Sequence, residues 1–277
     1  MFRKACTVAW AVSAVLGALA LAACQQARVG GGPTINLPKE RTVNLGGGVK
    51  LEMVLIPAGE FMMGSPDSDK SAAADEKPRH RVRITTPFYL GKYPVTQEQW
   101  TALMGNNPSF FKGPKNPVEN VSWDDGVLFF RRLNEQAGGG KFQFPTQAQW
   151  EYACRAGSTT RYCFGDDDPG LNDYGWYDKN AAGTTHPVGQ KKPNAWGLYD
   201  MHGNVWQWCA DWYDRGYYAR SPGDDPAGPA TGTERVSHGG CWFSGAGSAR
   251  SANHGRIEPG HRGSHIGFRA ALDPAGK

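Results

Sequence analysis

The stretch Pro193-Asn-Ala-Trp-Gly-Leu-Tyr-Asp-Met-His-Gly-Asn-Val-Trp-Gln-Trp208 is the most distinctive part of this chain, and it lies in a region without clear hydrophobic periodicity. From Gly157 onward, aromatic residues are interspersed with Gly, Asp and Asn, so the pattern predicts neither a long helix nor a long strand. The region nevertheless carries too many Trp and Tyr residues to be disordered. We therefore expect an ordered, irregular segment.

The composition favours a single loop-rich domain. The chain has 277 residues, of which 39% are hydrophobic, 37 are Gly and 19 are Pro, and this combination supports a sizeable core with many turns. The formal net charge of +4 is mild, so we expect no nucleic-acid partner. No internal repeat or linker interrupts residues 43–272, which we predict to form one domain followed by a tail at 273–277.

Local patterns before Gly157 predict strands and short helices. Alternating β-prone residues predict strands at 51–57, 59–65, 81–85 and 88–95. Each predicted helix begins at a capping box, in which a Ser or Thr precedes by three residues a side chain that can return the hydrogen bond. These capping residues are Thr96, Ser122 and Thr146.

The N-terminus predicts export and lipidation. Arg3 and Lys4 precede an apolar run that ends in Leu21-Ala-Ala-Cys24, which resembles a bacterial lipobox. We expect a signal peptide at 1–23, a lipid on Cys24 that attaches the protein to a membrane, and a flexible tether at 24–42. Because Gln25 rather than Asp follows the cysteine, the outer membrane is the expected location in a Gram-negative organism. The alternative is a transmembrane anchor of about 19 residues.

Cysteine usage agrees with an oxidising compartment. Cys154, Cys163, Cys209 and Cys241 remain after Cys6 and Cys24 are assigned to the leader and the lipid. An even number predicts up to two disulfides, with a local Cys154–Cys163 bridge and a Cys209–Cys241 bridge across paired strands. Four separate thiols are the alternative.

Five phrases resemble the formylglycine-generating enzyme family, also called the sulfatase-modifying factor family. They agree with the family in order and spacing and lie at 53–64, 93–100, 117–123, 144–153 and 193–206. The resemblance implies an α+β, C-type-lectin-like domain with small twisted antiparallel sheets, a few short helices and much irregular loop.

The family's catalytic cysteine pair is missing from this chain. Formylglycine-generating members bind copper(I) through two thiolates, and the matching positions here are Ser244 and Ala249. A hydroxyl is a poor copper(I) ligand and a methyl group is none, so we expect no copper. Cys241 and Trp206 lie nearby in the motif, and a substitute site from Cys241 and Cys209 is disfavoured. Oxygen-dependent oxidation of a substrate cysteine by an altered site remains the alternative to binding.

The resemblance also implies calcium at two turns. The first set of ligands comprises Asp200, Gly203, Val205 and Gln207, and the second, less secure set comprises Asn172, Asp173, Asn180 and Ala182. Oxygen donors suit calcium, although Gln207 replaces a Glu and so removes one negative charge. Turns held by hydrogen bonds alone are the alternative.

The segment 238–265 is the predicted binding surface for a protein or a small-molecule ligand. Aromatic, Arg and His side chains on loops are typical contact residues. The candidates are His238, Trp242, Phe243, Ser244, Arg250, Asn253, His254, Arg256, His261 and His265. The segment also resembles the variable tail of lectin-fold proteins diversified by retroelements. A zinc site from His254, His261 and His265 and an ordinary solvated surface are further interpretations.

Overall fold

Three helices begin at the predicted capping boxes. They are α1 (Gln97–Met104), α2 (Trp123–Ala137) and α3 (Gln147–Arg155). In each box the hydroxyl of the capping residue accepts a hydrogen bond from the backbone N–H three residues on, for example Asp125 N to Ser122 Oγ at 3.1 Å. A fourth helix, α4 (Leu171–Tyr174), is a single turn in the irregular segment.

The computed structural model describes residues 1–2 and 37–276, and the chain from Leu37 onward forms one compact unit. The predicted signal peptide, Cys24 and most of the tether lie outside the described residues. No helix among the residues described is long and apolar enough to cross a membrane.

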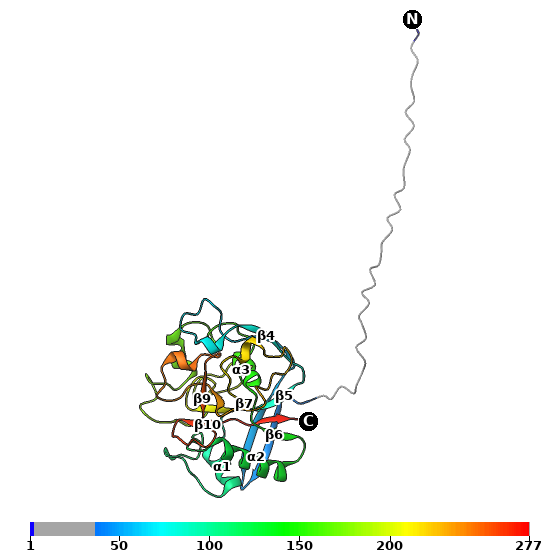
Figure 1. Cartoon of the computed structure of the whole chain (residues 1–277). Helices are drawn as coiled ribbons and strands as arrows, with labels where there is room; N and C mark the ends of the chain where they lie inside the picture. The colour runs from blue at the N-terminus through cyan, green and yellow to red at the C-terminus, as the bar shows by residue number, and fades with distance from the viewer. Residues whose placement is uncertain (3–36, 277) are drawn as a thin grey trace. The chain divides into compact units, whose positions relative to one another are not determined.

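A five-stranded antiparallel sheet combines strands from the N-terminal part of the domain with its last strand (Figure 1). Its order is β1 (Glu40–Gly46), β2 (Val49–Ile56), β5 (Phe88–Gly91), β11 (Ala271–Asp273) and β6 (Lys141–Gln143). The first strand pairs Glu40 with Val54, so the last three residues of the predicted tether belong to the domain. At the other end β11 extends one residue into the predicted tail, because Asp273 pairs with Lys141 of β6.

A four-stranded sheet carries the aromatic motif. Its order is β10 (Ile266–Phe268), β7 (Trp206–Trp212), β8 (Arg235–His238) and β9 (His254–Ile257), and β10 runs parallel to β7. The hairpin of β3 (Gly59–Met63) and β4 (His80–Ile84) forms a separate two-stranded sheet. Short 3-10 turns lie at 74–76, 168–170, 217–219 and 246–249.

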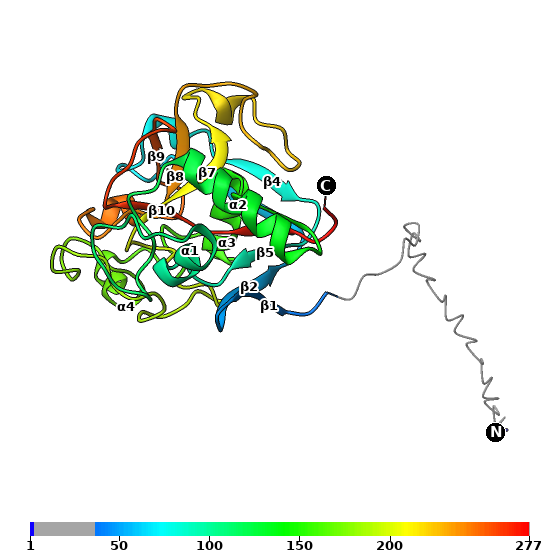
Figure 2. The same ribbon diagram turned by 90° about the horizontal axis from the view of Figure 1, so that it is seen from below.

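The largest core cluster lies where α1 and α2 pack side by side against β1 and β2 (Figure 1, Figure 2). Phe268 of β10 is fully buried there, and its ring lies 5.3–6.2 Å from the rings of four neighbours, which are Trp100, Phe129, Phe130 and Phe144. The short strand β10 thus buries an aromatic side chain against both helices.

We predict that Phe268→Ala lowers the free energy of unfolding by about 3–5 kcal/mol, because it leaves a cavity among the four rings. The matched control is Phe110→Ala, whose ring is 72% exposed and whose loss should change stability by less than about 0.5 kcal/mol. Urea denaturation of both variants measures the difference, and equal stabilities would contradict this account of the core.

Candidate functional site

Six aromatic side chains form a continuous strip, here called the aromatic strip. Successive ring centroids lie 4.7–5.6 Å apart in the order Phe110, Phe111, Trp242, Phe243, His265 and His261. Phe110 is 72% exposed and Phe243 is 51% exposed, although phenylalanine side chains are usually buried. The strip joins the loop after α1 to the segment 238–265.

The quoted motif positions the central Trp242. Asn204 has a backbone φ of 68°, in the left-handed region, and its carbonyl accepts a hydrogen bond from Trp242 N at 3.0 Å. The indole Nε1 of Trp242 donates to the carbonyl of Ser264 at 3.0 Å. Two backbone carbonyls from distant segments therefore fix Trp242, one at its backbone N–H and one at its indole, and the next residue, Phe243, is exposed.

The loop after α1 positions the other end of the strip. The buried Glu119 accepts a hydrogen bond from Phe111 N at 2.7 Å, and Gln97 Nε2 donates to the Phe111 carbonyl at 2.7 Å. Burial raises the pKa of Glu119. The sequence analysis did not identify Phe110 and Phe111, because the contacts that bring them to Trp242 are tertiary.

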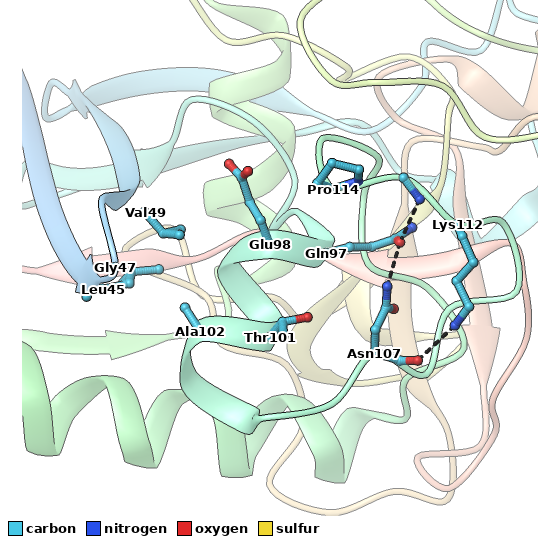
Figure 3. Close-up of a pocket in the computed structure, with 12 residues that line it drawn as sticks. Leu45, Gly47, Val49, Gln97, Glu98, Thr101, Ala102, Asn107, Lys112 and Pro114 are labelled. Atoms are coloured by element: carbon cyan, nitrogen blue, oxygen red, sulfur yellow. Dashed lines mark hydrogen bonds between the residues drawn. The ribbon is translucent and has the colours of Figure 1, made fainter.

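A groove of about 710 Å³ lies beside this loop, between the β1–β2 turn and α1 (Figure 3). Its polar side chains hold one another: Gln97 Oε1 accepts from Asn107 Nδ2 at 2.8 Å and from Gly113 N at 3.0 Å, and Lys112 Nζ donates to the Asn107 carbonyl at 2.9 Å (Figure 3). These bonds shape the loop that carries Phe110 and Phe111.

Half of the predicted binding residues lie in or near the aromatic strip. Trp242, Phe243, His261 and His265 belong to it, and Ser244 is partly buried beside Cys241, with 3.1 Å between Oγ and Sγ. Arg256 is exposed elsewhere, where its guanidinium lies 4.9 Å from the ring centroid of Tyr213.

Other predicted binding residues are structural, which corrects the sequence analysis. Arg250 is buried and pairs with Glu76 at 2.7 and 2.8 Å, and Asn253 Nδ2 donates to the same carboxylate at 3.2 Å. His238 is fully buried and stacks on Trp150 at 4.6 Å. His254, opposite His238 in the β8–β9 pairing, has only 3% of its side chain exposed.

The zinc prediction is also wrong. His254 lies against Tyr213 and Tyr218, whereas His261 and His265 lie in the aromatic strip. Within residues 37–276 no group of three His, Cys, Asp or Glu side chains could hold a metal ion.

Comparison with known proteins places residues 47–274 in a family described as the sulfatase-modifying factor enzyme 1-like domain. The chain belongs to this family. The formylglycine-generating enzyme of Thermomonospora curvata is 31% identical over 80% of this chain and 93% of its own length. The chaperone protein LppX of Paenibacillus barcinonensis is 29% identical over 79% of this chain and 88% of its own length.

Two solved structures of the family share the fold. Treponema denticola variable protein 1 superimposes with a TM-score of 0.76 at 30% identity, covering 85% of this chain and 99% of its own. PvdO from Pseudomonas aeruginosa gives a TM-score of 0.75 at 29% identity, covering 84% and 98%. These matches confirm the α+β, C-type-lectin-like architecture predicted from the five phrases.

The family's thiolate positions cannot bind copper(I) in this chain. Ser244 Oγ accepts a hydrogen bond from Cys241 N at 3.1 Å, and Ala249 is buried beside Tyr162, Leu171 and Tyr177. Burial raises the pKa of the Cys241 thiol, which disfavours the thiolate that a soft metal requires.

The predicted disulfides are absent, because Cys154, Cys163, Cys209 and Cys241 are free thiols. The β7–β8 register pairs Trp208 with Ser237, which leaves Cys241 well beyond the residue opposite Cys209. Cys154 Sγ instead lies 3.6 Å from Ser251 Oγ and 3.8 Å from His202 Nε2.

The donor atoms of the first predicted calcium turn do not fit the ion. The Asp200 carboxylate accepts hydrogen bonds from Gly189 N at 2.8 Å and Asn204 Nδ2 at 3.2 Å. Gln207 Oε1 accepts from Trp150 Nε1 at 2.9 Å and from the guanidinium of Arg269 at 3.0 Å. A buried protein cation therefore lies where calcium was expected.

The second predicted turn is similar. Asp173 pairs with Lys192 at 2.7 Å, and Lys191 Nζ donates to the Asn172 carbonyl at 2.6 Å. Asn180 Oδ1 accepts from Tyr177 N at 2.9 Å, while Ala182 adopts a φ of 50°. The Asn172 side-chain oxygen accepts a hydrogen bond from the Tyr177 hydroxyl at 3.0 Å, so both side-chain oxygens that the family resemblance assigned to calcium already have protein donors.

We predict that calcium and a chelator give the same melting midpoint, because the oxygens at both turns already accept hydrogen bonds from protein donors. Differential scanning calorimetry with excess Ca²⁺ and with EGTA tests this. A calcium-dependent rise in the midpoint that Asp200→Asn abolishes would contradict it.

We also predict that Glu76→Gln lowers the free energy of unfolding by about 3–5 kcal/mol, because it removes the two short bonds to the buried Arg250 and leaves only the longer pair with Asp69 at 3.4 Å. The matched control is Glu60→Gln at the exposed pair with Arg81, where the loss should stay below about 1 kcal/mol. Denaturation of both variants at neutral pH measures the difference.

This pair also gives a pH dependence. Burial alone would raise the pKa of Glu76, but hydrogen bonds from Arg250 and Ser65 outweigh it and lower the pKa to about 2. The stabilisation is therefore complete above the ordinary carboxyl pKa of 4.5 and is lost as the pH falls toward 2. Glu76→Gln should flatten this part of the stability profile, and an unchanged profile would contradict the assignment.

Proposed function

We propose that this protein is an exported, lipid-anchored member of the family that binds a protein partner through the aromatic strip. The observation that carries the proposal is the continuous run of six rings, with Phe110 and Phe243 exposed at separate points along it. Exposed aromatic clusters on rigid scaffolds are typical of protein interfaces, where Trp and Phe contribute most of the binding energy.

The hydrogen bonds that hold the strip in place support a role in binding. Trp242 is held by the carbonyls of Asn204 and Ser264, and Phe111 is held by Glu119 and Gln97. A preorganised aromatic surface loses little conformational entropy when a partner docks. Phe243 and His265 of the strip lie in the segment 238–265, which resembles the variable tail of diversified lectin-fold proteins, and this supports a surface whose partner can change while the frame stays.

Export and anchoring follow from the lipobox at Cys24, with the outer membrane as the proposed location in a Gram-negative organism. In this proposal the lipid holds the domain at a membrane surface, and the tether lets the aromatic strip reach a partner there.

A second candidate function is oxidation of a substrate thiol by an altered site. The 31% identity to a formylglycine-generating enzyme favours it, because that similarity extends over nearly the whole domain. Against it, Cys241 is a buried thiol 3.1 Å from Ser244 Oγ, and Ala249 offers no ligand. Oxygen uptake with copper(I) and a cysteine-containing peptide should show no turnover, and turnover lost in Cys241→Ser would favour the enzyme.

Site-specific photo-cross-linking tests the binding proposal. A photoreactive phenylalanine analogue at positions 110 and 243, in the full-length protein in its own membrane, should give the same discrete cross-linked protein. The matched control is position 127 on α2, where Val127 is an apolar side chain that is 43% exposed but lies outside the strip. Cross-links of equal yield at 127, or none at 110 and 243, would contradict the proposal.

Affinity for the cross-linked partner gives the quantitative prediction. Phe243→Ala and Phe110→Ala should each weaken binding by about tenfold or more, because each removes an exposed ring that the partner would bury. Val127→Ala should leave the affinity unchanged. Unchanged melting temperatures in all three variants would confirm that the loss is one of contact rather than folding.

A further inference from the structure

A pocket of about 310 Å³ opens between the β3–β4 hairpin and the end of α3. Phe61 and Met62 of β3, Arg79 just before β4, and Tyr152 of α3 are among its lining residues, and the segment 157–159 closes one side. A pocket of this volume accommodates a small organic molecule. None of these residues belongs to the aromatic strip.

One wall of the pocket is aromatic. The rings of Phe61 and Tyr152 lie 5.2 Å apart, and Tyr152 also contacts Trp196 at 4.9 Å, which holds the phenol in place. Met62 adds an apolar side chain that is 39% exposed. The wall therefore presents a fixed surface on which a planar apolar group can pack.

The three arginines of the pocket differ in how their charge is compensated. The buried Arg155 pairs with Glu151 at 2.7 Å, and Arg81 pairs with Glu60. Arg79 has no carboxylate partner among the described residues. Its Nη2 donates one long hydrogen bond, 3.5 Å, to the Thr159 carbonyl, and its Nε has no partner within the described chain.

The unpaired guanidinium of Arg79 is costly where it lies. Arg79 is half-buried, and burial together with the nearby charge of Arg155 lowers its pKa, although the Glu151 carboxylate, which is paired with Arg155, opposes part of this shift. An unpaired cation beside a second arginine destabilises the empty pocket, and an anion would relieve this repulsion. A guanidinium fork is also the side chain best suited to bind a carboxylate through two hydrogen bonds.

We propose that this pocket binds a small organic monoanion, with its carboxylate on Arg79 and its planar apolar body against Phe61 and Tyr152. The charges of the lining residues favour a ligand with a single negative charge. Arg79 is the one arginine of the three that has no ion pair with a carboxylate among the described residues. A dianion would place its second charge near Glu60, which is unfavourable.

The site is independent of the proposed partner-binding surface. The aromatic strip is built from the loop after α1 and the segment 238–265, whereas this pocket is built from β3, the residue before β4 and the end of α3. Failure of one proposal therefore does not affect the other.

Phenylacetate is the probe that tests the pocket, because it joins one carboxylate to one aromatic ring. We expect phenylacetate to bind the full-length protein in isothermal titration calorimetry, with an affinity that falls as salt is added. Phenylacetamide, which has the same shape without the charge, should bind about tenfold or more weakly, and acetate should bind no better than phenylacetamide.

Two variants locate the interaction. Arg79→Gln should weaken phenylacetate binding by about tenfold or more, and Arg79→Lys should restore part of it because the charge returns without the fork. The matched control is Arg83→Gln in the adjoining strand β4, outside the pocket lining, which should bind as the unaltered protein does. Melting curves of the free variants check that each is folded.

Three results would contradict the proposed monoanion site. Equal affinity of phenylacetate for Arg79→Gln and the unaltered protein would remove Arg79 as the anion site. Equal affinity of phenylacetamide and phenylacetate would show that charge is not recognised. An absence of phenylacetate binding at millimolar concentration, with all variants folded, would overturn the pocket as a monoanion site.

Discussion

The buried guanidinium of Arg269 holds this domain together. The side chain is fully buried, and its hydrogen bonds reach Gly91 of β5, the Tyr199 carbonyl and Gln207 of β7 at 2.5, 2.6 and 3.0 Å. Burial lowers the pKa of Arg269 to about 10, but the nearby Asp200 offsets part of this effect. One cation therefore joins the five-stranded sheet, the four-stranded sheet and the turn between them. Such a buried charge is tolerated only when its donors are satisfied.

The position of the aromatic strip follows from this arrangement. Gln207 bridges Arg269 and Trp150, which fixes the start of β7, and Asn204 just before it fixes Trp242 through a backbone hydrogen bond. The same arrangement bears on the predicted calcium site at this turn. The guanidinium already supplies a positive charge beside Asp200, and a divalent ion would have to compete with that charge as well as with the N–H donors.

What could be predicted from the sequence were the features that depend on neighbouring residues. The capping boxes at Thr96, Ser122 and Thr146 place each helix start to the residue, because their hydrogen bonds span three positions. Burial in the segment 238–265 was harder to predict. There the β8–β9 register decides that His238 faces His254, and no periodicity reports that register in strands of four residues.

Long-range partners explain the remaining differences. Arginine is a residue type typical of contact surfaces, but the buried Glu76, together with Asp69, draws Arg250 inward from a distant part of the sequence. Phe110 and Phe111 lie in a polar loop, and only Glu119 and Gln97 bring them beside Trp242. The four cysteines are free thiols, which matches the alternative of separate thiols rather than two bridges, because spacing along the chain does not determine the distance and orientation that a bridge requires.

The two residues at the family's cysteine positions, Ser244 and Ala249, both take part in the local structure. The turn after β8 closes through a hydrogen bond between Cys241 N and Ser244 Oγ, and Ala249 fills a small apolar cluster with Tyr162 and Leu171. Neither replacement leaves a cavity or an unpaired polar group at its position, so the scaffold does not depend on thiolates there. Beside that turn the Ser264 carbonyl holds the indole of Trp242 and the Asn204 carbonyl holds its backbone N–H, while the ring of Phe243 stays exposed. The turn can therefore present a fixed aromatic surface next to Ser244, one of the two positions that the family resemblance assigns to a cysteine.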